Sequence, residues 1–309
     1  MGPRPWSVAL RSTMLAAACA LAASHPSAAG NDRRGAAWTL GLAPARVRPG
    51  DAFLVTVRGP GAAGLAPGDL AGTVAGRALS FFPIPGGAVA FGALPLETPP
   101  GPLPVRVAAG AATVARDLLV TAPAFPQRRL EVDPRFVEPP DPALQARIDE
   151  DRAAFAKAFA QPPVPPLFSG SFVLPRRARV TAGYGEQRTL NAVKPSQHYG
   201  MDLAGKIGAP VAASNAGEVV LVRDCWASGR TVILSHGAGV YTTYFHLSRI
   251  LVEPGQRVAR GQRIGLVGGT GRVSGPHLHW GVRVGDLYVD PASVLRLRLR
   301  VAAPAARTR

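Results

Sequence analysis

The stretch VAASNAGEVVLVRDCWASGRTVILSHGAGVYTTYF, residues 211–245, decides the fold of the second half of the chain. Runs rich in Val, Ile, Leu and Thr alternate in it with glycine-containing turns, a pattern typical of antiparallel strands. The segment HGAG at 236–239 separates two of these runs, as a hairpin loop does. Working outward, we expect strands at 211–213, 218–223, 231–234, 240–245, 264–267 and 279–284, which predicts an antiparallel β domain over residues 167–298.

Residues 36–122 have the spacing of a small β-sandwich. Apolar runs at 53–57, 88–91, 103–107 and 116–120 alternate with Gly and Pro turns. This region contains no His or Cys, and its acidic residues are isolated. We therefore predict a mainly β protein with a β-sandwich-like accessory domain at residues 36–122. This domain is expected to have a positioning or binding role and no catalytic one; the alternative is that it only spaces or shields the second half of the chain.

A connector is expected between these two regions, at residues 123–166. Prolines cluster on both sides of a helical segment, and Asp141-Pro142 is a typical helix start. Leu144, Ile148, Phe155 and Phe159 recur at helical spacing and form one apolar stripe. Acidic residues 149–151 fall mostly off this stripe, so we expect the stripe to pack on a domain.

The first 29 residues have the pattern of a signal peptide. Arg4 and Arg11 precede or flank an apolar run at 14–23, and small residues at 27–29 offer a cleavage site. This predicts export to the periplasm or cell envelope, and the run is too short for a comfortable membrane span. Lipid attachment at Cys19 stays open; removal of Cys19 leaves Cys225 alone, which excludes an intramolecular disulfide. Residues 299–309 are expected to form a tail.

The net charge of +16 comes almost wholly from arginine. It is either a consequence of genome composition, the reading we favour, or a basic surface attracted to an anionic polymer. The arginines are scattered and do not form a dense run interleaved with aromatic residues, so we do not expect nucleic-acid binding.

Chemistry is expected where the histidines cluster. Five of the six histidines, together with Asp202, lie between 198 and 279. On a strand, His277, His279 and Gly281 would share one face, and Gly281 would leave room for a metal ion or a substrate. His198 and Asp202 are close in sequence, but Gly200 between them favours a loop entering a strand over a helix. Two imidazoles and a carboxylate make the ligand set of catalytic zinc sites, which keep a fourth position for water.

From the residues alone, the division between metal-binding and proton-transferring histidines stays open. The segments HYGMD at 198–202, SHGAGVYTTYFHLSRI at 235–250 and VEPGQRVARGQRIGLVGGTGRVSGPHLHWGV at 252–282 resemble the lysostaphin-like zinc peptidases that hydrolyse peptidoglycan cross-links. The resemblance implies a lysostaphin-type fold with a duplicated hybrid motif and one Zn²⁺ per catalytic domain. It also implies that His198, Asp202 and His279 bind this zinc, and that His246 and His277 act as catalytic base and transition-state stabiliser.

The substrate implied by the resemblance is peptidoglycan, with an envelope protein as a further expected partner. Glycine bridges, D-alanyl-diaminopimelate cross-links and stem peptides stay open as the bond that is cut. A non-catalytic wall-binding or activator protein on the same fold is the main alternative. A biotinyl or lipoyl carrier is rejected, because the last lysine, Lys206, precedes the repeat that suggests one.

Two further residues receive weaker predictions. We expect His236 to be structural, as part of the hairpin. Tyr244 would share a strand face with His246 and could hydrogen-bond a tetrahedral intermediate.

Overall fold

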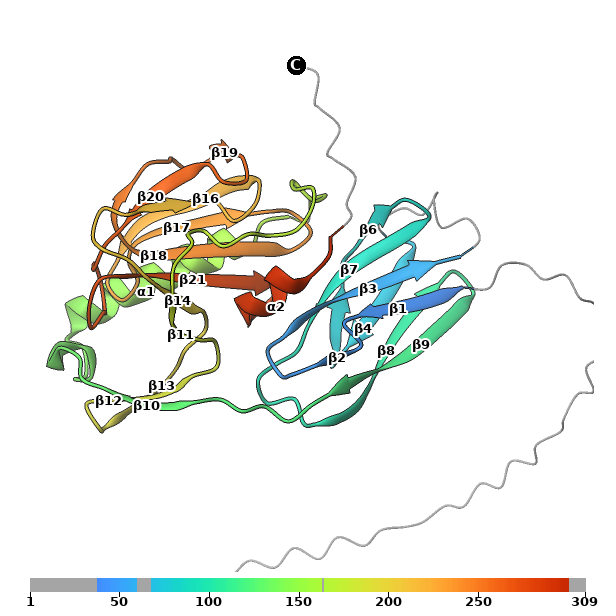
Figure 1. Ribbon diagram of the computed structural model, residues 1–309, viewed down its shortest axis with the longest axis horizontal. Helices are drawn as coiled ribbons and strands as arrows, with labels where there is room; N and C mark the ends of the chain where they lie inside the picture. Colours follow the sequence, from blue (N-terminus) through green and yellow to red (C-terminus); the bar gives the residue numbers. More distant parts are fainter. Residues whose placement is uncertain (1–37, 60–67, 163, 300–309) are drawn as a thin grey trace, which may run out of the picture. The chain divides into compact units, whose positions relative to one another are not determined.

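The computed structural model describes residues 38–59, 68–162 and 164–299 (Figure 1). The predicted signal peptide, Cys19 and nearly all of the predicted tail lie outside these residues. Within them the chain is mainly β, as predicted, with 22 strands and two α-helices. None of the described helices is long and apolar enough to cross a membrane.

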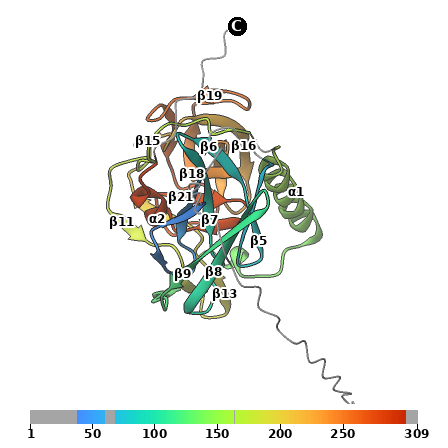
Figure 2. The same cartoon turned by 90° about the vertical axis from the view of Figure 1, so that its right-hand side faces the viewer.

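The first half forms two sheets that share one core. Phe53, Val55 and Val57 alternate along one strand and are fully buried against Val105 and Leu118 of the other sheet. Strands β8 (Gly101–Ala109) and β9 (Ala112–Val120) run side by side as a long hairpin (Figure 2). One sheet has the order β1 (Thr39–Ala43), β3 (Ala52–Arg58), β7 (Gly87–Ala93), β6 (Phe81–Ile84). The other has the order β2 (Arg46–Val47), β9 (Ala112–Val120), β8 (Gly101–Ala109), β4 (Leu70–Val74), β5 (Arg77–Leu79).

The second half is built on an antiparallel sheet that contains all six predicted strands. Leu234, Leu278 and Trp280 are fully buried in its core. The central order is β11 (Val180–Ala182), β14 (Met201–Ala204), β21 (His277–Val284), β18 (Val240–Ile250), β17 (Gly229–Ser235), β16 (Gly217–Cys225), β19 (Arg257–Val258). Strand β15 (Pro210–Ala212) pairs with β20 (Arg263–Val267), and β20 pairs with β18. Strand β22 (Leu287–Val289) pairs antiparallel with β21 and is followed by helix α2 (Pro291–Arg296).

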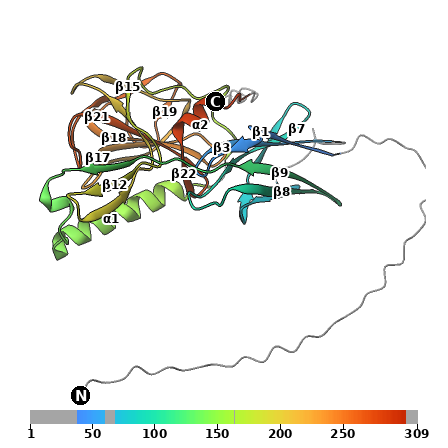
Figure 3. The same cartoon turned by 60° about the horizontal axis from the view of Figure 1, so that its bottom comes forward.

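Helix α1 (Pro142–Phe159) begins where the sequence predicts, because the Asp141 carboxylate accepts a hydrogen bond from the Leu144 N–H at 2.8 Å. Two residues of its apolar stripe pack on the sheet, where Phe155 and Phe159 lie against Ile233 and Tyr241. Figure 3 shows α1 running beside the strands of the second half. The helix therefore covers one face of strands β17 and β18.

The expectation that the acidic residues of this helix lie off the buried face is wrong for Asp151. Its carboxylate is buried, 2.6 Å from Arg223 Nε, and accepts a hydrogen bond from the Trp226 N–H at 2.8 Å. The charge can be buried because both oxygens have donors.

The connector also contributes a strand that the sequence did not predict. β10 (Gln127–Leu130) pairs in parallel with β12 (Gln187–Leu190), which pairs in turn with β13 (Lys194–Gln197). The polar run QRRL has no apolar alternation, so nothing local indicates a strand. This pairing ties the connector to the segment that leads into His198.

Candidate metal centre

The register of three neighbouring strands brings the predicted residues together. In the β14–β21 pair Asp202 lies directly opposite His279, and in the β18–β21 pair Phe245 lies opposite His279. Leu278, Trp280 and Val282 turn into the core and are fully buried, so His277 and His279 share the opposite face, as predicted. His198 comes from the loop between β13 and β14, also as predicted.

The glycines beside these residues are explained by close packing. A Cβ on Gly200 would lie 2.5 Å from His279 Nε2, so only glycine allows the imidazole to reach its position. The expectation that Gly281 leaves open room is wrong: a Cβ there would meet Thr243 Oγ1 at 2.5 Å and Tyr288 Cε1 at 3.3 Å.

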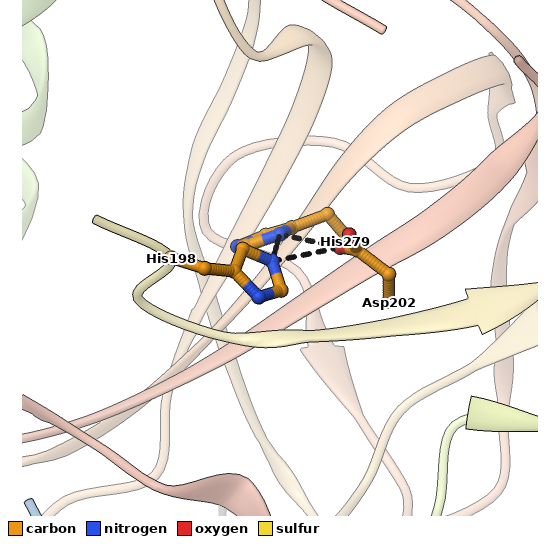
Figure 4. Close-up of side chains that lie close together, drawn as sticks. All are labelled: His198, Asp202 and His279. Carbon is orange, nitrogen blue, oxygen red and sulfur yellow. Dashed lines mark hydrogen bonds and ion pairs between the residues drawn. The ribbon is translucent and has the colours of Figure 1, made fainter. Parts of the chain in front are cut away.

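His198, Asp202 and His279 converge on one point (Figure 4). His198 Nε2 lies 2.9 Å from Asp202 Oδ1 and 3.0 Å from His279 Nδ1. His279 Nδ1 in turn lies 2.9 Å from Asp202 Oδ1. Bonds of about 2.0 to 2.2 Å to a tetrahedral ion would place such donor atoms roughly 3.3 Å apart. The three atoms need to separate by only a few tenths of an ångström to hold zinc, so the set fits this ion.

Backbone carbonyls fix the tautomers of three histidines around this point. Nδ1 of His198 donates to Gly183 O at 2.7 Å, Nδ1 of His246 to Thr270 O at 2.8 Å and Nδ1 of His277 to Gly275 O at 2.8 Å. Since a carbonyl oxygen can only accept, Nε2 is the lone-pair nitrogen of each neutral ring. His198 Nε2 and the Asp202 carboxylate face each other in a buried place, so a proton or a metal ion must lie between them.

The electrostatics of the site favour an ionised carboxylate and neutral imidazoles. Burial would raise the pKa of Asp202, but its contacts with His198 and His279 outweigh burial and hold this pKa well below its ordinary value. Burial lowers the pKa of His279, against the opposing effect of Asp202. Burial, with the neighbouring His277 and His279, lowers the pKa of His246 to about 3. Metal binding requires these protonation states.

Arg188 holds the second oxygen of Asp202, a contact that sequence reasoning missed. Arg188 Nη2 lies 3.0 Å from Asp202 Oδ2, while its Nε lies 2.6 Å from Glu186 Oε1. Oδ2 is thereby engaged and Oδ1 is turned toward the two histidines. No motif marks Arg188 among the many arginines, and only the pairing of β12 reveals its place.

His246 and His277 lie beside the three converging residues. Their ring centroids are 4.9 Å apart, and His277 Nε2 is 3.7 Å from Asp202 Oδ1. His246 has a φ of 63°, in the left-handed region that residues other than glycine seldom adopt. This backbone turn breaks the alternation of β18 and directs His246 toward the cluster.

The prediction for Tyr244 is wrong for the same reason. Because the alternation ends at His246, Tyr244 faces the core instead and is fully buried. Its hydroxyl hydrogen-bonds Ser214 Oγ and Thr242 Oγ1, both at 3.0 Å. It stabilises the sheet and does not reach the candidate site.

Two other residues, His236 and Cys225, carry side chains that could take part in chemistry. His236 is fully buried between Ala216 O and Thr242 Oγ1, both at 2.7 Å, so it is structural as predicted. Cys225 ends strand β16 and is buried. Burial raises the pKa of its thiol, which disfavours the thiolate that a nucleophile needs.

Two cavities meet at the cluster. The larger, of about 1060 Å³, lies between helix α1 and the sheet, and its lining includes His198, His246 and His279. Its aromatic lining consists of Phe155, Phe159, Tyr199, Trp226, Phe245 and Tyr288. The smaller, of about 360 Å³, is lined by His246, His277, His279 and Asp202, and by several arginines. An extended chain could cross the cluster by occupying both.

Comparison with known proteins relates this part of the chain to a peptidase family. Residues 196–291 match the model of peptidase family M23. The chain is 47% identical over 103 residues to the peptidoglycan DD-endopeptidase ShyA of Vibrio cholerae, covering 33% of this chain and 24% of ShyA. It is 42% identical over 115 residues to ShyB of the same organism, covering 36% of this chain and 26% of ShyB. The chain thus spans about a quarter of the length of these curated relatives.

Among solved structures, a candidate M23 peptidase from Pseudomonas aeruginosa resembles most of the chain. It has a TM-score of 0.58 and 29% sequence identity, and the match covers 80% of this chain and 93% of that one.

Proposed function

We propose that this chain, which belongs to peptidase family M23 through residues 196–291, is a zinc-dependent metalloendopeptidase that hydrolyses peptide bonds of bacterial peptidoglycan. The observation that carries the proposal is the convergence of His198, Asp202 and His279 to within hydrogen-bonding distance of one another, with His246 and His277 beside them. These three residues are the proposed ligands of one zinc ion.

Zinc bound there would lower the pKa of a coordinated water and polarise the scissile carbonyl. The protein residues then have separate tasks. Arg188 orients Asp202, and the carbonyls of Gly183, Thr270 and Gly275 orient three imidazoles. His246, whose pKa burial lowers, is neutral at pH 7 and can accept a proton at Nε2. His277 Nε2 lies 3.7 Å from Asp202 Oδ1. In its imidazolium form, which carries a proton on Nε2, His277 can stabilise a developing oxyanion or donate to the leaving amine.

For the bond that is cut, the name DD-endopeptidase, which ShyA and ShyB carry, supports a D,D-peptide bond. Among the bonds left open above, the D-alanyl-diaminopimelate cross-link is of this kind, and we propose it as the substrate. A peptidoglycan substrate supports action in the envelope or periplasm, after export directed by residues 1–29. We further propose residues 36–122 as an accessory domain that contacts the wall or an envelope protein, 123–166 as the connector, 167–298 as the peptidase domain and 299–309 as a tail.

The test is digestion of purified sacculi, with mass spectrometry of the released fragments and zinc analysis of the protein. Wild-type protein should bind one zinc and convert cross-linked dimers to monomers. Asp202→Ala and His279→Ala should lose both properties, whereas His246→Ala should keep zinc and lose hydrolysis. Loss of zinc in His246→Ala would refute the assignment of roles, and absence of released fragments with wild-type protein would refute the function.

A further inference from the structure

The smaller cavity beside the cluster is strongly basic. Four arginines line it, and Asp202 is the one carboxylate among its lining residues. Two of these arginines already have partners: Arg188 contacts Glu186 and Asp202, and Arg128 lies 3.8 Å from Glu186. Arg179 is exposed. Arg272, the fourth, is partly buried and lines both cavities.

Among the described residues, Arg272 has no acidic partner. Within the described part of the chain, no carboxylate lies within ion-pair distance of its guanidinium, and its side chain makes no hydrogen bond. Burial, followed by the charge of Arg188, lowers the pKa of Arg272, the direction expected when desolvation and a like charge impose a free-energy cost on the cation. An anionic ligand in the cavity would relieve this cost.

The backbone that carries Arg272 is rigidly connected to the proposed catalytic residues. The Arg272 N–H donates to Ala227 O at 2.7 Å, and Thr270, two residues earlier, accepts from His246 Nδ1. Gly271 between them has a φ of 76°, and a Cβ there would lie 2.4 Å from Gly229 N. A ligand held by Arg272 would therefore be held at a fixed place relative to His246.

We propose that Arg272 binds a free carboxylate of the peptide substrate, and that the preferred substrate carries this carboxylate next to the scissile nitrogen. The inference rests on the proposed function. In a D-alanyl-diaminopimelate cross-link, the carbon that bears the leaving amine also bears a free carboxylate. A glycine bridge has no carboxylate at that position. The guanidinium fork matches a carboxylate with two parallel hydrogen bonds, so Arg272 selects the first kind of cross-link over the second.

The experiment uses zinc-loaded full-length protein and two purified muropeptide dimers that differ only in this carboxyl group, free in one and amidated in the other. Wild-type kcat/KM should be about 10- to 100-fold higher for the free carboxylate, the usual effect of losing a charge-assisted hydrogen bond. Arg272→Gln should lose that preference and keep its zinc. Arg272→Lys should retain part of it. Arg249→Gln, the same change at an exposed arginine outside both cavities, should behave as wild type.

Binding gives a second readout that needs no turnover. In the His246→Ala background, calorimetry should show tighter binding of the free-carboxylate dimer, and Arg272→Gln should abolish the difference. Equal cleavage of both dimers by wild-type protein, or an unchanged preference in Arg272→Gln, would overturn the role of Arg272. Failure of wild-type protein to cleave either dimer would instead overturn the proposed function.

Discussion

Gly200→Ala adds a single methyl group and should still disable the proposed zinc site. The new Cβ would lie 2.5 Å from His279 Nε2, 2.6 Å from Cε1 and 2.8 Å from Trp280 O. Contact at an ordinary separation requires the imidazole to move by about 1 Å, whereas metal–ligand distances tolerate roughly 0.2 Å. His279 cannot move so far and keep its place beside His198 and Asp202.

We expect Gly200→Ala to weaken zinc binding by at least about 10-fold and to lower kcat/KM by roughly 100-fold, the usual cost of a 1 Å misplacement. Zinc affinity is measured by competition with a chromogenic chelator, and hydrolysis with a muropeptide dimer. Gly269→Ala is the control, because a Cβ there meets nothing closer than 3.9 Å. Wild-type zinc affinity and activity in Gly200→Ala would refute the role of His279.

Three further predictions concern the surroundings of the site. Arg188→Gln removes the donor 3.0 Å from Asp202 Oδ2 and should weaken zinc binding by about 10- to 100-fold in the same competition assay, and an unchanged affinity would contradict its positioning role. Asp151→Ala leaves Arg223 Nε and the Trp226 N–H without their acceptor and should lower the free energy of unfolding by about 1 to 3 kcal/mol in urea titrations. Glu150→Gln removes only the exposed partner of the same arginine and should change this free energy by less than about 0.5 kcal/mol. Burial lowers the pKa of His236 from about 6.5 in the unfolded chain to about 4 in the folded protein. The neutral ring therefore contributes about 3 kcal/mol to stability above pH 6.5, and this contribution is lost as the pH falls from 6.5 through 4. His236→Gln should flatten that part of the stability profile, and an unchanged slope would show that other groups produce it.

The sequence was informative where the backbone is regular. His277 and His279 share a face because β21, paired with a strand on each side, keeps strict alternation. The alternating apolar residues Leu278 and Trp280 are buried in the core on the other face. Helix α1 begins at its predicted cap for an equally local reason, since Asp141 satisfies a free N–H of the first turn.

Prediction failed where a long-range or irregular feature decides the structure. The positive φ of His246 ends the alternation of side chains along β18, so His246 and Tyr244 face opposite sides. No glycine or other residue type near His246 predicts this change from the sequence. Arg188 and Arg272 are two of many arginines, and only strand pairing and the cavity lining distinguish them. Asp151 looked like a surface residue because its partner, Arg223, lies 72 positions away.

Anomalous X-ray diffraction at the zinc absorption edge, on crystals of the zinc-loaded protein, tests the metal centre most directly. A single strong peak within about 2.2 Å of His198 Nε2, Asp202 Oδ1 and His279 Nδ1 is the predicted result. A peak bonded to His246, or one remote from residues 198, 202 and 279, would contradict it.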